Sequence, residues 1–307
     1  MRRITLKHQV CTLDDQLLFP PGTLLTKEKV DAAIRLSGAD SYQAHPLLSY
    51  GTVKGDLSYL LSVSPYVTIF MGKREMNDLM SLLATLRFPI PILQSLDYFK
   101  KNDFHTYAHV LLVFVLSVLL AKDLIPDEKE RIPLTAAGPT HDMGKTCVPL
   151  QILKKTTPLT KKERSLIEHH AVASYALLSY YYKSTQHLAC RVALDHHERK
   201  DGSGYPRGIL LKDPLVEIVA VSDVYDALIK PRSYRSEAYD NRTALEEITE
   251  MADQNKFGWD VVKALIARNR TPHPHYKEIT ISAQRRGSPP SINFYGITVD
   301  DRGEDGP

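Results

Sequence analysis

The chain has 307 residues, of which 43% are hydrophobic and 24% charged, as is ordinary for a globular protein. This length allows a sizeable core, in one large or two modest domains. The net charge of +3 gives little support for a nucleic-acid-binding surface. The three cysteines, Cys11, Cys147 and Cys190, have no paired spacing, which argues against a disulfide framework and favours a reducing compartment.

The most apolar run, Val110 to Ala121, is too short to cross a membrane. At about 1.5 Å per residue, a helix of this length falls well short of a bilayer core of about 30 Å. The N-terminal stretch MRRITLKHQV is basic, but neither a long apolar stretch nor a small-residue cleavage site follows it. We therefore expect a buried helix, no membrane insertion and a cytoplasmic protein.

Residues 1–88 are predicted to form a separate, smaller α/β unit with a regulatory or sensory role. A strand, a Pro-Pro-Gly turn and a helix are expected first, with Thr26 as the helix N-cap and Gly38 as its stop. The stretch RFPIPIL, residues 87–93, is predicted as a linker because each proline disfavours helix in the residue before it.

Residues 89–270 have the pattern of a helical domain. Apolar residues recur at three- and four-residue spacing over 105–121, 163–182, 187–197, 214–229 and 243–268, although a partial strand stays open for 214–229. Thr160 and Glu163 match a capping box, which predicts a helix start there. The tail, residues 271–307, is rich in Pro and Gly and is expected to be irregular. The predicted fold class is mainly α, a helical bundle with a small N-terminal α/β domain.

Five segments of the helical region carry residue types that bind divalent metals. HTYAH places two histidines four residues apart on one helix face, and HDMGK, IEHHA, DHHE and VSDVYDAL supply further imidazoles and carboxylates. A carboxylate such as that of Asp142 can bridge two ions. The candidates are His105, His109, His141, Asp142, His169, His170, His196, His197, Asp223 and Asp226.

Taken singly, each candidate has an ordinary structural explanation, such as a packed helix histidine. His169 and His170 point about 100° apart on a helix, so we expect only one to face inward. His170 shares a face with apolar residues and is chosen, which leaves His169 as a partly exposed bystander. The remaining histidines lack such neighbours and are expected to be surface or core residues: His8, His45, His187, His273 and His275.

Read together, the motifs resemble a known family. Over roughly residues 100–250 the chain is similar to the HD-GYP domain, a branch of the HD phosphohydrolases. The similar stretches are, in order, HDMGK followed by VP, LTKKERSLIEHH, HHERKDGSGYP and AVSDVYDALIKPRSYR. The resemblance implies an HD-type helical bundle that holds two or three divalent ions, commonly iron or manganese. It also implies hydrolysis of the second messenger cyclic di-GMP.

The resemblance assigns roles to individual positions. Asp142 would bridge the ions, Lys145 would contact the scissile phosphate, and Arg232 and Arg235 would grip substrate phosphates. The alternative for the two arginines is that they are solvated loop charges, and Tyr205 could line the substrate entrance or only pack against its loop. The implied metal ligands are His109, His141, Asp142, His170, His196, His197 and Asp223.

This ligand set agrees with the chemistry of phosphodiester hydrolysis. Two ions about 3.5–4 Å apart can hold a bridging hydroxide in line with the leaving sugar oxygen. The predicted product is linear pGpG, with GMP as an onward product. Two alternatives stay open: a catalytically weak or inactive module that binds nucleotide or signalling proteins through the GYP loop or the N-terminal domain, and an HD hydrolase acting on another nucleotide.

Some positions depart from the family pattern. Members with three metals carry a glutamate where this chain has His105, so a third ion should bind less well and two ions are expected. Pro139 should disturb a helix just before the ligand pair. In the GYP loop, Asp201 and Ser203 are expected to cap the turn, and Glu198 to orient a ligand from behind it.

Overall fold

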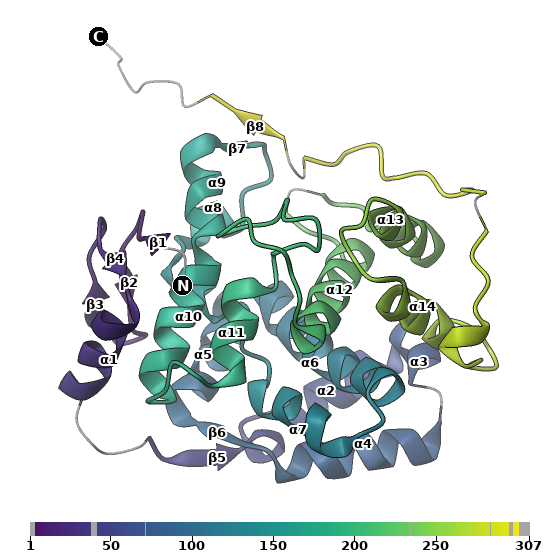
Figure 1. Ribbon diagram of the computed structural model, residues 1–307, viewed down its shortest axis with the longest axis horizontal. Helices are drawn as coiled ribbons and strands as arrows, with labels where there is room; N and C mark the ends of the chain where they lie inside the picture. The colour runs from purple at the N-terminus through teal and green to yellow at the C-terminus, as the bar shows by residue number, and fades with distance from the viewer. Residues whose placement is uncertain are drawn as a thin grey trace.

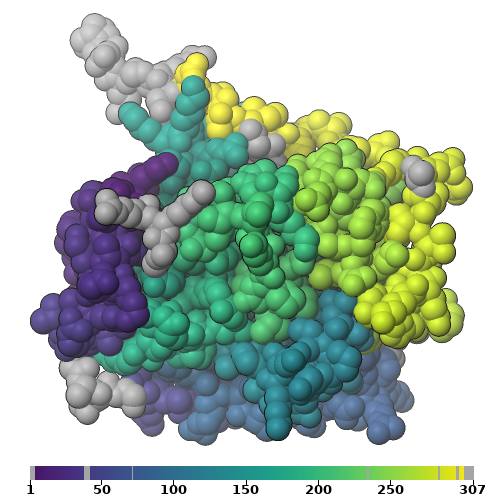
Figure 2. Space-filling view, viewed as in Figure 1, coloured from purple at the N-terminus to yellow at the C-terminus, as the bar shows by residue number. Residues whose placement is uncertain are grey.

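The computed structural model describes residues 4–37, 42–70, 72–233, 235–282, 284–294 and 297–300. Helices dominate it, which confirms the mainly α class. At the N-terminus, β1 (Ile4–Thr5) pairs antiparallel with β4 (Leu24–Leu25), and β2 (Val10–Cys11) with β3 (Leu17–Phe19). These strands and α1 (Lys27–Leu36) form one flank of the molecule, at the left in Figure 1 and purple in Figure 2.

The predicted N-cap of α1 is confirmed, because the Thr26 side chain accepts a hydrogen bond from the Lys29 N–H. The predicted stop at Gly38 lies outside the described residues. α1 packs against α10 (His170–Tyr181). The N-terminal flank therefore lies against a helix of the predicted metal-binding region.

A second N-terminal segment precedes the bundle helices. It contains β5 (Ala44–Pro46), η1 (Leu47–Ser49), α2 (Val53–Ser62), α3 (Tyr66–Ile69) and α4 (Lys73–Thr85). The prediction of a linker at residues 87–93 is wrong. β6 (Arg87–Pro89) pairs antiparallel with β5, and α5 (Ile90–Asn102) follows directly. Pro91 is tolerated in the first turn of α5, where its missing N–H costs no helical hydrogen bond.

α6 (Phe104–Leu124) is the central helix. It packs against α2, α5, α7 (Glu128–Ala137), α12 (Pro214–Ile229) and α14 (Trp259–Arg268). The helix is longer than its most apolar run, so the expectation that it is too short to cross a membrane is wrong: among the described residues it is the one helix long and apolar enough to do so. The expected burial is confirmed, because 78% of its apolar window is buried inside the molecule. Buried surroundings of this kind are typical of a core helix.

Two long predicted helices are each divided. Residues 163–182 form α9 (Lys161–Glu168) and α10, with His169 between them, and the capping box of Thr160 and Glu163 at the start of α9 is confirmed. Residues 243–268 form α13 (Asn241–Asp253) and α14. Asn255 between them has φ of 56°, a left-handed conformation that commonly ends a helix.

The other predicted elements have the following form. Residues 187–197 contain α11 (Leu188–Asp195), and 214–229 is helical throughout as α12, without a strand. Shorter elements are η2 (Met143–Cys147), α8 (Leu150–Leu153), β7 (Leu159–Thr160), η3 (Tyr276–Glu278) and β8 (Thr298–Val299). The described tail is mostly irregular and runs along the bundle surface to β8, which pairs in parallel with β7 (Figure 1).

Candidate metal centre

The loop after α7 brings His141 and Asp142 into the middle of the bundle. α7 ends at Ala137, and Gly138 follows with φ of 65°. A Cβ at Gly138 would lie 2.4 Å from the Phe88 ring, so the close approach as well as the backbone conformation requires glycine. The disturbance predicted at Pro139 is thus observed as the end of α7. Both His141 and Asp142 are buried, directly before η2.

His109 on α6 lies between two carboxylates of α12. Its Nδ1 is 2.6 Å from Asp226 Oδ2, and its Nε2 is 3.0 Å from Asp223 Oδ1. The two aspartates are three residues apart and therefore share a face of α12. A carboxylate on Nδ1 fixes the imidazole tautomer and ring direction, and this pairing commonly supports metal-binding histidines.

The two oxygens of Asp142 face two different groups of imidazoles. Oδ1 lies 3.1 Å from His170 Nε2 and 3.9 Å from His196 Nε2. Oδ2 lies 3.5 Å from His141 Nε2 and 3.6 Å from His109 Nε2. This is the arrangement required of a carboxylate that bridges two ions.

The histidines around Asp142 Oδ1 direct their Nε2 atoms at one another. His170 Nδ1 lies 2.6 Å from the Ile167 carbonyl and His196 Nδ1 lies 2.9 Å from the Ala193 carbonyl, so both Nδ1 atoms donate. In neutral rings the two Nε2 atoms then carry lone pairs, yet they are 3.3 Å apart. His197 Nε2 is 3.2 Å from His170 Nε2.

Such a convergence of lone pairs calls for a cation. His141 Nε2 is buried and has no hydrogen-bond partner among the described residues. Imidazole nitrogen and carboxylate oxygen together suit first-row divalent metals, so the residues present fit the expected ions. Three groups of ligand atoms are close enough to hold an ion: His170, His196 and His197; His109, His141 and Asp223; and His141, Asp142 and His196.

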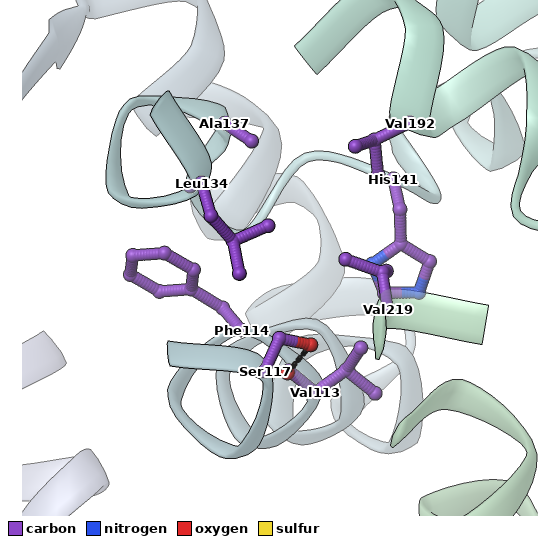
Figure 3. A pocket seen from close by; sticks show the side chains of 9 residues that line it. Val113, Phe114, Ser117, Leu134, Ala137, His141, Val192 and Val219 are labelled. Carbon is purple, nitrogen blue, oxygen red and sulfur yellow. Dashed lines mark hydrogen bonds between the residues drawn. The ribbon is translucent and has the colours of Figure 1, made fainter. Parts of the chain in front are cut away.

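Burial keeps several of these imidazoles neutral. It lowers the pKa of His141 to about 4 and that of His196 to about 3, and it lowers the pKa of His197 well below its ordinary value. Figure 3 shows the cause at His141, where the apolar side chains of Val113, Val192 and Val219 surround the ring. Neutral imidazoles have a lone pair available for a metal without first losing a proton.

The charged groups of the centre have shifted pKa values as well. Burial alone would raise the pKa of Asp142, but Lys145 and neighbouring histidines hold it well below the usual range. For His109, burial and Arg232 act to lower the pKa, but hydrogen bonds to the aspartates of α12 outweigh them and raise it.

Two of the predicted phosphate-binding cations lie beside the carboxylates, and the third does not. Lys145 Nζ donates to Asp142 Oδ2 at 2.6 Å, and Arg232 Nη2 lies 3.8 Å from Asp226 Oδ2 and 3.0 Å from His109 Nδ1. Arg235 is 2% exposed, and its guanidinium donates to the carbonyls of residues 227, 228, 230 and 237. This placement does not fit the predicted phosphate grip, because Arg235 instead holds together the turn after α12.

The histidines outside the centre have varied surroundings. His170 rather than His169 faces Asp142, as predicted, but His169 is buried at 8% exposure rather than partly exposed, with its ring against that of His8. His105 is exposed and belongs to none of the ligand groups among the described residues. The five other histidines expected at the surface or in the core also lie outside these groups.

The GYP loop is a tightly packed turn. Ser203 donates to Asp201 Oδ1 from both its N–H and its hydroxyl, at 2.9 Å and 2.7 Å, which confirms the predicted cap. A Cβ at Gly204 would lie 2.3 Å from the His197 carbonyl oxygen. The Tyr205 ring stacks on the His197 ring with centroids 4.5 Å apart, so it packs beside one of the predicted metal ligands.

The expectation for Glu198 is wrong. Its fully buried carboxylate accepts hydrogen bonds from the N–H groups of Arg207 and Ile209, at 2.8 Å and 3.0 Å. Glu198 therefore closes the GYP loop instead of orienting a ligand histidine.

The sequence motifs assign no role to two residues that support His109. Asp226 was only a general candidate, although its spacing from Asp223 on a helix face was a usable signal. Tyr66 on α3 donates its hydroxyl hydrogen bond to Asp226 Oδ1 at 2.7 Å. No motif connects it to the centre, because the contact joins residues 160 positions apart.

Three curated relatives act on cyclic dinucleotides. A cyclic di-GMP phosphodiesterase of Thermotoga maritima is 34% identical over 152 residues, which cover 48% of this chain and 41% of that protein. A cyclic di-GMP phosphodiesterase of Pseudomonas aeruginosa is 37% identical over 175 residues, covering 56% and 41%. The 3′3′-cGAMP-specific phosphodiesterase 1 of Vibrio cholerae is 37% identical over 181 residues, covering 58% and 39%. The chain thus spans about two fifths of the length of these relatives.

A family model also matches the part of the chain that forms the centre. The model is described as HD domain, and it matches residues 97–261, which contain every predicted ligand and all three groups of ligand atoms. Because this match covers more than half of the chain, the protein belongs to the HD domain family, as its resemblance to HD-GYP domains predicted.

Proposed function

We propose that the protein is a metal-dependent phosphodiesterase that hydrolyses cyclic di-GMP to linear pGpG, with GMP as the product of a second cut. The observation that carries the proposal is Asp142, whose two oxygens face separate groups of imidazoles. The curated relatives that act on cyclic di-GMP support the choice of substrate.

Two divalent ions, iron or manganese, are the proposed cofactors. When bound, they would neutralise phosphate oxygens and lower the pKa of a water from about 15.7 to about 7. Asp142 is the proposed bridging ligand, and Asp223 faces both sides, with Oδ1 3.0 Å from His109 Nε2 and Oδ2 3.8 Å from His197 Nδ1. The proposed ligands are His109, His141, Asp142, His170, His196, His197 and Asp223.

The cationic side chains would act on the substrate. Lys145 lies 2.6 Å from the proposed bridging carboxylate, so its Nζ would neutralise a phosphate oxygen or give a proton to the leaving sugar oxygen. Arg232 has a planar fork that can donate two hydrogen bonds to one phosphate. Tyr205, stacked on His197, is the proposed aromatic wall of the substrate site.

An activity assay tests this proposal. Purified protein reconstituted with Mn²⁺ or Fe²⁺ should convert cyclic di-GMP to pGpG, and chromatography of the reaction mixture measures the product. The Asp142→Ala variant should show no conversion. Asp78→Ala, an exposed carboxylate on α4, is the matched control and should retain full activity. Metal-loaded wild-type protein that binds cyclic di-GMP but yields no product would contradict the proposal.

A second candidate substrate is 3′3′-cGAMP, because one relative of comparable identity is specific for it. The two cyclic dinucleotides differ in one base, so the same phosphodiester chemistry would serve both. Parallel assays at equal concentration would rank them by kcat/KM. A higher value for 3′3′-cGAMP would replace cyclic di-GMP as the proposed substrate.

A further inference from the structure

Tyr66 belongs to a part of the chain that precedes the family match. It begins α3, and the HD domain match starts at residue 97. Its side chain is fully buried, yet its hydroxyl is not left among apolar groups, since it donates to Asp226 Oδ1 at 2.7 Å. A segment outside the family match therefore reaches a carboxylate beside the metal centre.

Asp226 connects this hydroxyl to His109. One carboxylate oxygen accepts from Tyr66, and the other lies 2.6 Å from His109 Nδ1. The Asp226 side chain is 1% exposed, so water has little access to either oxygen. Removing the hydroxyl would leave Oδ1 of a buried anion without this donor, which is costly in a site of low polarity.

The Tyr66 ring is held in place on several sides. The ring of Tyr225 meets it edge to face with centroids 6.5 Å apart, and the Phe70 ring lies 6.4 Å away. Lys230 Nζ lies over the ring at 5.3 Å. With the ring fixed, the hydroxyl oxygen is held at hydrogen-bond distance from Asp226.

We propose that Tyr66 is a positioning residue of the metal centre. Its hydroxyl fixes the Asp226 carboxylate, Asp226 fixes the tautomer and ring plane of His109, and His109 then presents Nε2 to the ion. The inference rests on the proposed metal site and does not depend on which nucleotide is hydrolysed. Changes to such outer hydrogen-bond partners typically lower metal affinity by about 10- to 100-fold.

Metal titration of the EDTA-treated protein tests the inference without an activity readout. Tyr66→Phe keeps the ring and removes one oxygen, and it should weaken Mn²⁺ binding by about 10-fold in calorimetry. Tyr225→Phe is the matched control, because this tyrosine is also fully buried but donates to Asn241 and Asn269. The control should change Mn²⁺ affinity by less than about twofold, since its hydroxyl does not touch Asp226.

A double-mutant cycle separates positioning from packing. Asp226→Asn alone should weaken Mn²⁺ binding, and in that background Tyr66→Phe should have less than about a twofold further effect, because Tyr66 acts through Asp226. The visible absorption bands of bound Co²⁺ should also change in Tyr66→Phe but not in Tyr225→Phe. Equal affinities and spectra in wild type and Tyr66→Phe would overturn the inference.

The same experiments distinguish this inference from the proposed function. Wild-type protein that binds no Mn²⁺ would overturn both. Wild-type protein that binds Mn²⁺ with a 10-fold loss in Tyr66→Phe supports the positioning role, even where cyclic di-GMP is not hydrolysed.

Discussion

Single histidines near the centre make the stability of the protein sensitive to acid. Burial lowers the pKa of His141 and His169 to about 4 and that of His196 to about 3, from an ordinary value of 6.5. In the unfolded chain these imidazoles take up protons below pH 6.5, whereas in the folded protein they stay neutral. The unfolded state then binds more protons, so the free energy of unfolding falls as pH falls.

We therefore predict that metal-free protein loses stability between pH 6.5 and pH 4. Each of these histidines should contribute a slope of about 1.4 kcal/mol per pH unit in the middle of that window. The raised pKa of His109 has the opposite sign but acts only above pH 6.5, whereas the pKa of Asp195, raised by burial to about 6, offsets part of the histidine slope within the window. Urea unfolding in EDTA at a series of pH values measures the slope.

His169→Gln isolates one contribution, because His169 is not a proposed ligand. The variant should reduce the slope by about 1.4 kcal/mol per pH unit, since glutamine does not titrate. His105→Gln, at an exposed position, is the control and should leave the slope unchanged. An unaltered slope in His169→Gln would show that its imidazole protonates freely in the folded protein.

Gly204 gives a second prediction at the scale of one residue. A Cβ there would lie 2.3 Å from the His197 carbonyl oxygen and 2.4 Å from Glu198 Cα, both backbone atoms that cannot easily move. Gly204→Ala should lower the free energy of unfolding by about 1–3 kcal/mol. Gly55→Ala on α2, where a Cβ meets no atom within 4 Å, should instead raise it by about 0.5–1 kcal/mol. Urea unfolding compares the two, and equal effects would contradict the clash.

Among the elements, α9 depends on its capping box. The Thr160 side chain accepts from the Glu163 N–H at 3.2 Å, and Glu163 accepts from the Thr160 N–H at 2.7 Å. Thr160→Ala should cost about 1 kcal/mol in urea unfolding, because an N–H of the first turn loses its partner. Ser58→Ala, at an exposed position on α2, should stay within about 0.5 kcal/mol of wild type. A Thr160→Ala value in that same range would argue against the cap.

Elements with strong local signals were predictable from the sequence. The caps of α1 and α9, and the burial of α6, follow from residue types and spacing within a few positions. The breaks within the helices expected at 163–182 and 243–268 were not predictable, because the apolar periodicity continues across them. The strand at 87–89 was missed because its partner, β5, lies more than forty residues earlier.

In the metal centre too, local sequence patterns did not predict contacts between residues far apart in the chain. The proposed ligands were identified because each stands in a short motif. The residues that hydrogen-bond to these ligands from outside were not identified, since Tyr66 meets Asp226 only through the packing of α3. Arg235 matched a motif, but its guanidinium is buried against carbonyl groups, and a motif contains no information about where a side chain points. The sequence thus predicted which residues belong to the centre better than it predicted their hydrogen-bond partners.

For the molecule as a whole, bound metal should add to stability. The proposed ligands come from α6, the loop before η2, α10, the end of α11 and α12, so an ion holds together segments across the bundle. Mn²⁺ at 100 times its Kd should raise the free energy of unfolding by about 2.7 kcal/mol, and EDTA should reverse the gain. Thermal unfolding with and without Mn²⁺ measures it, with Asp142→Ala expected to show no gain. A metal-independent Tm in the wild type would contradict the proposed site.

The three-part division of the chain, at residues 88 and 270, stays a prediction at this scale. Contacts nevertheless cross the first boundary, since α2 packs on α6 and Tyr66 reaches Asp226. A fragment starting at residue 89 would lose both contacts and the β5–β6 pair. We expect it to bind Mn²⁺ more weakly than the full chain, as calorimetry would show.

The position of Asp142 has a practical consequence for anyone seeking a form of the protein with a single ion. Because each oxygen faces its own set of imidazoles, any change to this side chain would disturb both cation sites at once. An ion bound at one site would also hold the second oxygen in place for the other. Loading should then be cooperative. A one-ion form would require altering a peripheral nitrogen donor such as His197, which lies on one side only.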